Sequence, residues 1–156
     1  MTRRTSLTLT AIIFAAFSGG AVCAQSSRKN VSGAEVTGTF DHAFTGKFKG
    51  SASEIRILAL GKGKLKMAFD LIYPFVDGVG QLEANSGEVD GVATIEADTA
   101  MFVSGDNGEC RIRIKFVKPG LINVKQLGDS SGCGFGLNVS ADGTYKKVSG
   151  TKPKFE

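Results

Sequence analysis

Cys110-Arg111-Ile112-Arg113-Ile114-Lys115-Phe116 is the stretch that decides the fold, because its side chains alternate strictly between apolar and basic. Alternation with a period of two buries one face of a β-strand and leaves the other face in water. The same period recurs over residues 65–71 and at Phe135, Leu137 and Val139. No segment shows the period of an amphipathic helix, so the sequence predicts an all-β protein.

Turn residues separate the alternating runs. Gly61-Lys62-Gly63, Pro119-Gly120 and Asp142-Gly143 each lie between two such runs. Asp-Gly is a strong signal for a tight hairpin, so a hairpin is predicted between strands over residues 135–140 and 144–148. Short strands joined in this way indicate an antiparallel meander of about eight strands.

The predicted domain covers residues 34–150, between a flexible polar leader over 25–33 and a short C-terminal tail over 151–156. A closed β-barrel is the first interpretation, because closure removes the exposed edge strands of a long meander. A two-sheet β-sandwich is the alternative. Nothing in the composition indicates a second domain.

The first 24 residues have the pattern of a cleaved signal peptide. Two arginines precede an apolar run over residues 7–17, which is shorter than the roughly 20 residues that a membrane span needs. Val22-Cys23-Ala24 then satisfies the small-residue cleavage rule, so the mature chain is predicted to begin at Gln25. The sequence thus predicts a periplasmic or secreted protein with no stable membrane span.

Cleavage would change both the charge and the cysteine count. Residues 1–24 hold two of the 19 basic residues and none of the 15 acidic ones, so the net charge falls from +4 to +2. That value gives no general reason to expect a nucleic-acid partner. Cys110 and Cys133 remain, and an exported chain with two cysteines is expected to pair them. The competing interpretation, a metal or redox pair, lacks a CxxC motif and a histidine cluster around His42.

Charge is segregated along the chain. Residues 76–109 hold eight acidic residues and no lysine or arginine, whereas residues 110–156 hold nine basic and three acidic residues. Four acids at even positions would share one face of a regular strand, and these are Glu88, Asp90, Glu96 and Asp98. One interpretation pairs this acidic stripe with the basic stripe of residues 111–115 on an adjacent strand. The other leaves it free to dock a basic protein or a cation, although no calcium loop of the EF-hand kind is present.

No catalytic motif emerges. Asp41 and His42 are adjacent, which on a strand sends them to opposite faces, and no GxSxG elbow occurs. The glycine-rich stretch over residues 132–136 lacks the Lys-Ser/Thr of a phosphate loop, which makes it a structural segment or a contact loop through Gly134 and Phe135. We therefore predict a non-enzymatic protein without cofactor or metal.

A signal peptide, a small glycine-rich antiparallel domain and a late disulfide together resemble the small exported bacterial β-barrels of the periplasmic lysozyme-inhibitor kind. The resemblance is one of architecture. Those inhibitors present a Ser-Gly-x-x-Tyr loop, whereas here Ser149-Gly150-Thr151-Lys152 is followed by Pro153 and residues 131–134 are followed by Phe135. It implies an exported binding module, an inhibitor of a basic wall-degrading enzyme such as lysozyme. The alternative is a carrier that holds a small apolar ligand inside a phenylalanine-rich barrel.

Overall fold

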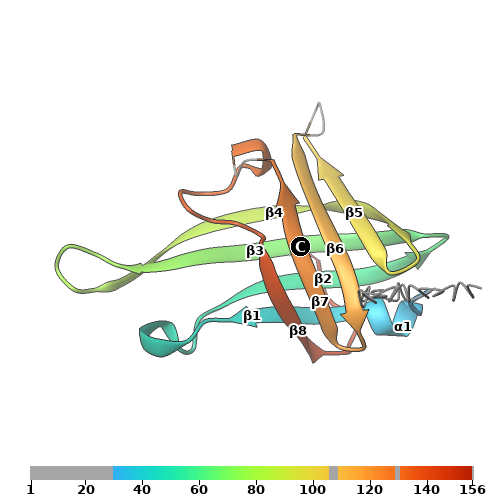
Figure 1. The fold of residues 1–156 in the computed structure, drawn as a ribbon, viewed down its shortest axis with the longest axis horizontal. Coiled ribbons are helices and arrows are strands. Elements are labelled where there is room, and N and C mark those ends of the chain that lie inside the picture. The colour runs from blue at the N-terminus through green and yellow to red at the C-terminus, as the bar shows by residue number, and fades with distance from the viewer. Residues whose placement is uncertain (1–29, 106–108, 129–130, 156) are drawn as a thin grey trace, which may run out of the picture.

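The computed structural model of the chain describes residues 30–105, 109–128 and 131–155. The predicted signal peptide and residues 25–29 of the predicted leader lie outside these ranges. Each strand pairs antiparallel with the next along the chain, and the last pairs with the first, so eight strands close into one barrel (Figure 1). The all-β barrel prediction is confirmed, and the β-sandwich alternative is wrong.

The barrel is built from long strands and very little helix. The elements in chain order are α1 (Gly33–Val36), β1 (Gly38–Ala43), η1 (Gly46–Phe48), β2 (Ala52–Gly61), β3 (Lys64–Val76), β4 (Leu82–Glu96), β5 (Thr99–Ser104), β6 (Cys110–Lys118), β7 (Leu121–Leu127), η2 (Ser131–Cys133) and β8 (Gly143–Ser149). Among the described residues, no helix has the length and apolar character needed to cross a membrane.

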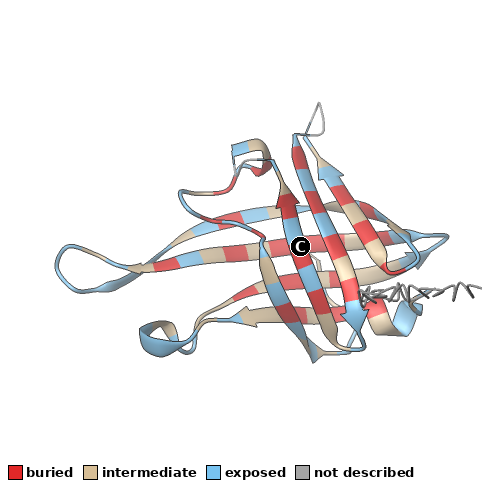
Figure 2. Ribbon diagram, in the orientation of Figure 1, coloured by how far each residue is buried: buried red, intermediate tan, exposed pale blue. Residues whose placement is uncertain are grey.

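The interior of the barrel is a packed core. Over residues 110–116 of β6 the apolar residues are buried and most of the basic residues are exposed, as the alternating sequence predicts (Figure 2). Phe69 and Phe102 pack edge to face inside, with their ring centroids 5.0 Å apart. The largest side chains with less than 2% exposure are Tyr145, Phe40, Phe69, Phe102, Phe116, Ile55, Ile57, Leu65, Met67, Leu71, Ile112 and Ile114. Large apolar groups of this kind are how small barrels fill their interior.

The connection between β7 and β8 departs from the sequence prediction. Residues 134–142 form an irregular segment, so the strand predicted over residues 135–140 and its hairpin at Asp142-Gly143 are wrong. Gly134 and Asn138 adopt left-handed conformations, with φ values of 70° and 63°, which interrupts an extended run. The Asp142 carboxylate accepts a hydrogen bond from the backbone of Gln126 at 2.6 Å and forms an ion pair with Lys125.

The same segment closes one end of the barrel. The disulfide between Cys110 and Cys133 confirms the predicted pairing and fixes the start of the segment to β6. Phe135 is 8% exposed and packs against Gly87 of β4. The backbone N–H of Gly136 donates to the Ser86 carbonyl at 3.1 Å, which holds the segment along β4.

At the opposite end, α1 covers the barrel (Figure 1). Ser32 caps the helix and Val36 is buried, so the last residues of the predicted leader are structured. The Lys147 Nζ donates to the carbonyls of Ala34 and Glu35 at 3.1 and 2.7 Å, which joins α1 to β8.

Replacing Gly87 with alanine is expected to destabilise the barrel by about 1–3 kcal/mol, the usual cost of overpacking. A Cβ at this position would lie 2.7 Å from Cδ1 and 3.0 Å from Cβ of Phe135, so this buried side chain would have to shift. Gly78→Ala is the matched control, because a Cβ there would meet nothing within 4 Å. Urea unfolding of both variants checks this, and equal midpoints would contradict the described packing.

Candidate functional site

The four acids of the predicted stripe divide into two groups. Glu88, Asp90 and Glu96 are exposed on the outer face of β4. Asp98 is only 4% exposed, because β4 ends at Glu96 and a turn follows. The Thr99 hydroxyl donates to its carboxylate at 2.9 Å. The prediction that Asp98 shares the acidic face is therefore wrong.

The acidic and basic stripes do not lie on adjacent strands. The acids lie on β4 and the basic residues on β6, with β5 hydrogen-bonded between them. Within the described ranges, no ion pair involves Glu88, Asp90 or Glu96. The interpretation in which the two stripes neutralise each other across one strand pair is wrong.

Instead, carboxylates line up across four neighbouring strands. Asp41 lies directly opposite Glu54, Glu54 opposite Asp70, and Asp70 opposite Glu88. All four belong to the outward-facing positions of β1 to β4. We call this set the acidic row. Like charges directly opposite each other destabilise a sheet, so the fold itself gains nothing from the arrangement.

One arginine compensates part of the acidic row. Arg56 donates to Oδ2 of Asp70 at 2.6 Å, and its Nε lies 3.4 Å from Oε1 of Glu54 without forming a hydrogen bond. Lys146 of β8 is opposite Asp41 at the far end of the row. Glu88, at the β4 end, is exposed, and Asp90 lies one step farther along the same face of β4.

Two members of the acidic row, Asp41 and Glu54, oppose folding when they are ionised. Burial raises the pKa of the Asp41 carboxyl, and one of its oxygens is enclosed without a hydrogen-bond partner. The pKa of Glu54 is raised by burial first and then by the charge of Asp41, with Arg56 acting in the other direction. A carboxyl whose pKa is higher in the folded chain destabilises the fold when it is ionised.

Glu54→Gln is therefore expected to stabilise the protein at pH 7 by about 0.5 kcal/mol, a small value because the group is largely solvated. The gain should shrink as the pH falls through the raised pKa, since Glu54 then becomes neutral in the wild type as well. Melting curves at pH 7 and pH 4 check this, with Glu83→Gln, an exposed glutamate outside the acidic row, as the control. A lower melting temperature for Glu54→Gln at pH 7 would contradict it.

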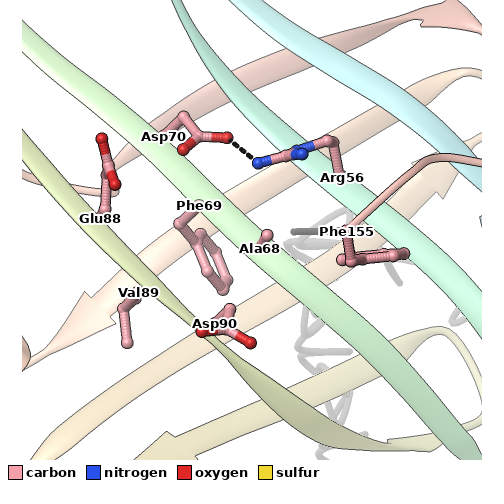
Figure 3. Close-up of a pocket in the computed structure, with 8 residues that line it drawn as sticks. All are labelled: Arg56, Ala68, Phe69, Asp70, Glu88, Val89, Asp90 and Phe155. Carbon is pink, nitrogen blue, oxygen red and sulfur yellow. Dashed lines mark hydrogen bonds and ion pairs between the residues drawn. The ribbon is translucent and has the colours of Figure 1, made fainter.

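Two shallow hollows of about 280 and 430 Å³ lie on this face and share Arg56, Asp70 and Glu88. Figure 3 shows the Arg56 side chain extending to Asp70, with Glu88 beyond Asp70 on the next strand. The C-terminal tail borders the smaller hollow through Phe155. Its backbone is held by Arg56, which donates to the Lys154 carbonyl at 2.9 Å.

The other residues singled out from the sequence are His42, Gly134 and Phe135. The Nδ1–H of His42 donates a hydrogen bond to the Thr144 carbonyl at 3.0 Å, and the imidazole contacts the rings of Phe44 and Tyr145. The Phe135 ring belongs to the core, whereas Gly134 is exposed at the surface. The suggestion that Gly134 and Phe135 contact a partner stays a prediction.

Sequence reasoning missed three members of the acidic row and their arginine. Asp41, Glu54 and Asp70 are isolated acids in segments rich in lysine and arginine. Only the pairing of β1 to β4 brings them into line with Glu88, and this pairing cannot be predicted from the spacing of residues within one segment.

No group of three or more histidine, cysteine, aspartate or glutamate side chains in the described part of the chain is arranged to hold a metal ion. Comparison of this chain with protein-family models, curated proteins and solved structures found no match.

Proposed function

We propose that this chain is an exported, non-enzymatic binding protein that docks a basic protein on the outer face of β1 to β4. The observation that carries the proposal is the acidic row, four carboxylates in register on four strands, of which Arg56 compensates only a part. Its β4 end at Glu88, with Asp90 beside it, has no ion-pair partner within the described ranges. Complementary charge of this kind speeds association and selects basic partners.

A basic wall-degrading enzyme such as lysozyme is the partner that we propose. The Cys110–Cys133 disulfide supports an oxidising compartment, where such enzymes act. The filled interior leaves the carrier alternative without support, because a ligand would have to displace buried phenylalanines.

Titration of the mature protein with a lysozyme at low and high salt tests the proposal. We expect binding at low salt, a large loss of affinity at high salt, and slower lysis of cell walls by the bound enzyme. A wall hydrolase with an acidic surface is the control and should not bind. Failure of all basic hydrolases to bind at low salt would contradict the proposal.

A further inference from the structure

β4 is much longer than its pairing with β5. The β4–β5 ladder covers only Ala93–Glu96, whereas the β3–β4 ladder covers Leu82–Thr94. Figure 1 shows the β3–β4 hairpin running well beyond the barrel while β5 turns away from it. One edge of β4 therefore has no strand neighbour in the described part of the chain over residues 82–92.

Two hydrogen bonds identify which backbone groups face this edge. The Ser86 carbonyl accepts from Gly136, so it points away from β3. Directly opposite, the backbone N–H of Ile72 donates to the Ser53 hydroxyl of β2 at 3.0 Å, so it points away from β4. Ser86 and Ile72 thus form a pair that exchanges no backbone bonds, and such pairs alternate along an antiparallel ladder.

The β3–β4 register is unbroken, so this alternation can be followed to the next residues. Glu88 and Asp90 follow Ser86 by two and four residues. Their backbone N–H and C=O groups therefore point the same way as those of Ser86, to the open edge. No backbone partner for these groups is present among the described residues. These groups lie between Ser86, which bonds to Gly136, and Ala93, where the pairing with β5 begins.

We propose that this edge of β4 is a strand-addition site for an extended, basic segment of the partner protein. An added strand would bond to the free groups of Glu88 and Asp90 while its lysines or arginines lie beside their carboxylates. A second copy of this chain is a poorer occupant, because two β4 edges would bring these carboxylates together. The inference rests on the proposed function and specifies how the partner is held.

The test uses the mature protein and a short synthetic peptide that alternates lysine with threonine. Its control is the same peptide methylated on every backbone nitrogen, which keeps the charge and the side-chain donors but cannot donate hydrogen bonds from its backbone. We expect the unmodified peptide to bind at least about tenfold more tightly, because only it can donate backbone hydrogen bonds to the carbonyls of the open edge.

Asp90→Pro tests the same site from the protein side. Its lost N–H points to the open edge, so the β3 ladder stays intact, as it does around Pro74 on the other strand. Asp90→Asn is the matched control that removes the charge alone. We expect Asp90→Pro to weaken peptide binding roughly tenfold more than Asp90→Asn.

The outcomes separate this inference from the proposed function. Equal binding of both peptides would overturn strand addition while leaving charge-based docking of the whole enzyme intact. Lysozyme binding without any peptide binding would do the same. Self-association of Asp90→Asn with unchanged peptide affinity would show that the carboxylate only protects an edge, and would also overturn the inference.

Discussion

Replacing Glu88 and Asp90 together with lysine is expected to weaken binding of a basic partner roughly 100-fold, mostly through slower association. Both side chains are exposed. Glu88 is the end of the acidic row that lies farthest from Lys146, and Asp90 lies beside it on β4. Reversal of two charges there replaces attraction by repulsion. The fall in affinity with rising salt should also become smaller in the variant, because two of the attractive charges that cause it are reversed. Association kinetics at several salt concentrations measure both effects.

The matched control is the double variant Glu83→Lys plus Glu96→Lys. It makes the same change in net charge on the same strand, and both glutamates are exposed outside the acidic row. We expect it to lose no more than a few-fold in affinity. Both double variants should melt near the wild-type temperature, since exposed substitutions rarely change stability much. Equal losses in the two variants would show that net charge, and not the acidic row, directs binding.

Removing the disulfide is expected to have the largest effect on stability. Cys110 and Cys133 are separated by 23 residues, for which the chain-entropy model predicts a stabilisation of roughly 3 kcal/mol. The bond also fixes the start of the segment that closes the barrel over Gly87. Cys110→Ser plus Cys133→Ser should lower the melting temperature by about 10 °C in a domain of this size.

Reduction of the wild type should reproduce this loss, and reduction of the double variant should change nothing further. Hydrogen exchange should also become faster in residues 134–142, because the segment loses its anchor. Unchanged melting of the wild type under reducing conditions would contradict a stabilising role for the bond.

The sequence predicts the barrel because apolar and polar residues alternate within single segments, and this alternation indicates strands with one buried face. The run over residues 110–116 shows which face of β6 is buried, and the turn at Gly61-Lys62-Gly63 separates β2 from β3. The segment over residues 135–140 has the same alternation but forms no strand. The left-handed Gly134 and Asn138, together with the disulfide anchor, outweigh an alternating pattern of only three apolar residues.

The candidate site is less predictable because it depends on contacts between distant segments. The even positions of Glu88 and Asp90 predict that both side chains lie on one face of a strand, and both are exposed on the outer face of β4. The prediction for Asp98 is wrong because the strand ends two residues earlier, at Glu96. The turn that follows contains Ala97 in a left-handed conformation, with a φ of 53°. The position of Asp41 beside Glu54 is a property of register across the sheet, which no local pattern contains.

Amide NMR of the isotope-labelled protein, titrated with a lysozyme at low salt, is the most direct test of docking on the acidic row. We expect the strongest changes at Glu54, Asp70, Glu88 and Asp90, on the outer face of neighbouring strands. Residues of the packed interior, such as Phe102, should change little. Absence of any change at stoichiometric enzyme, or changes confined to the barrel interior or to α1, would contradict a docking site on the acidic row.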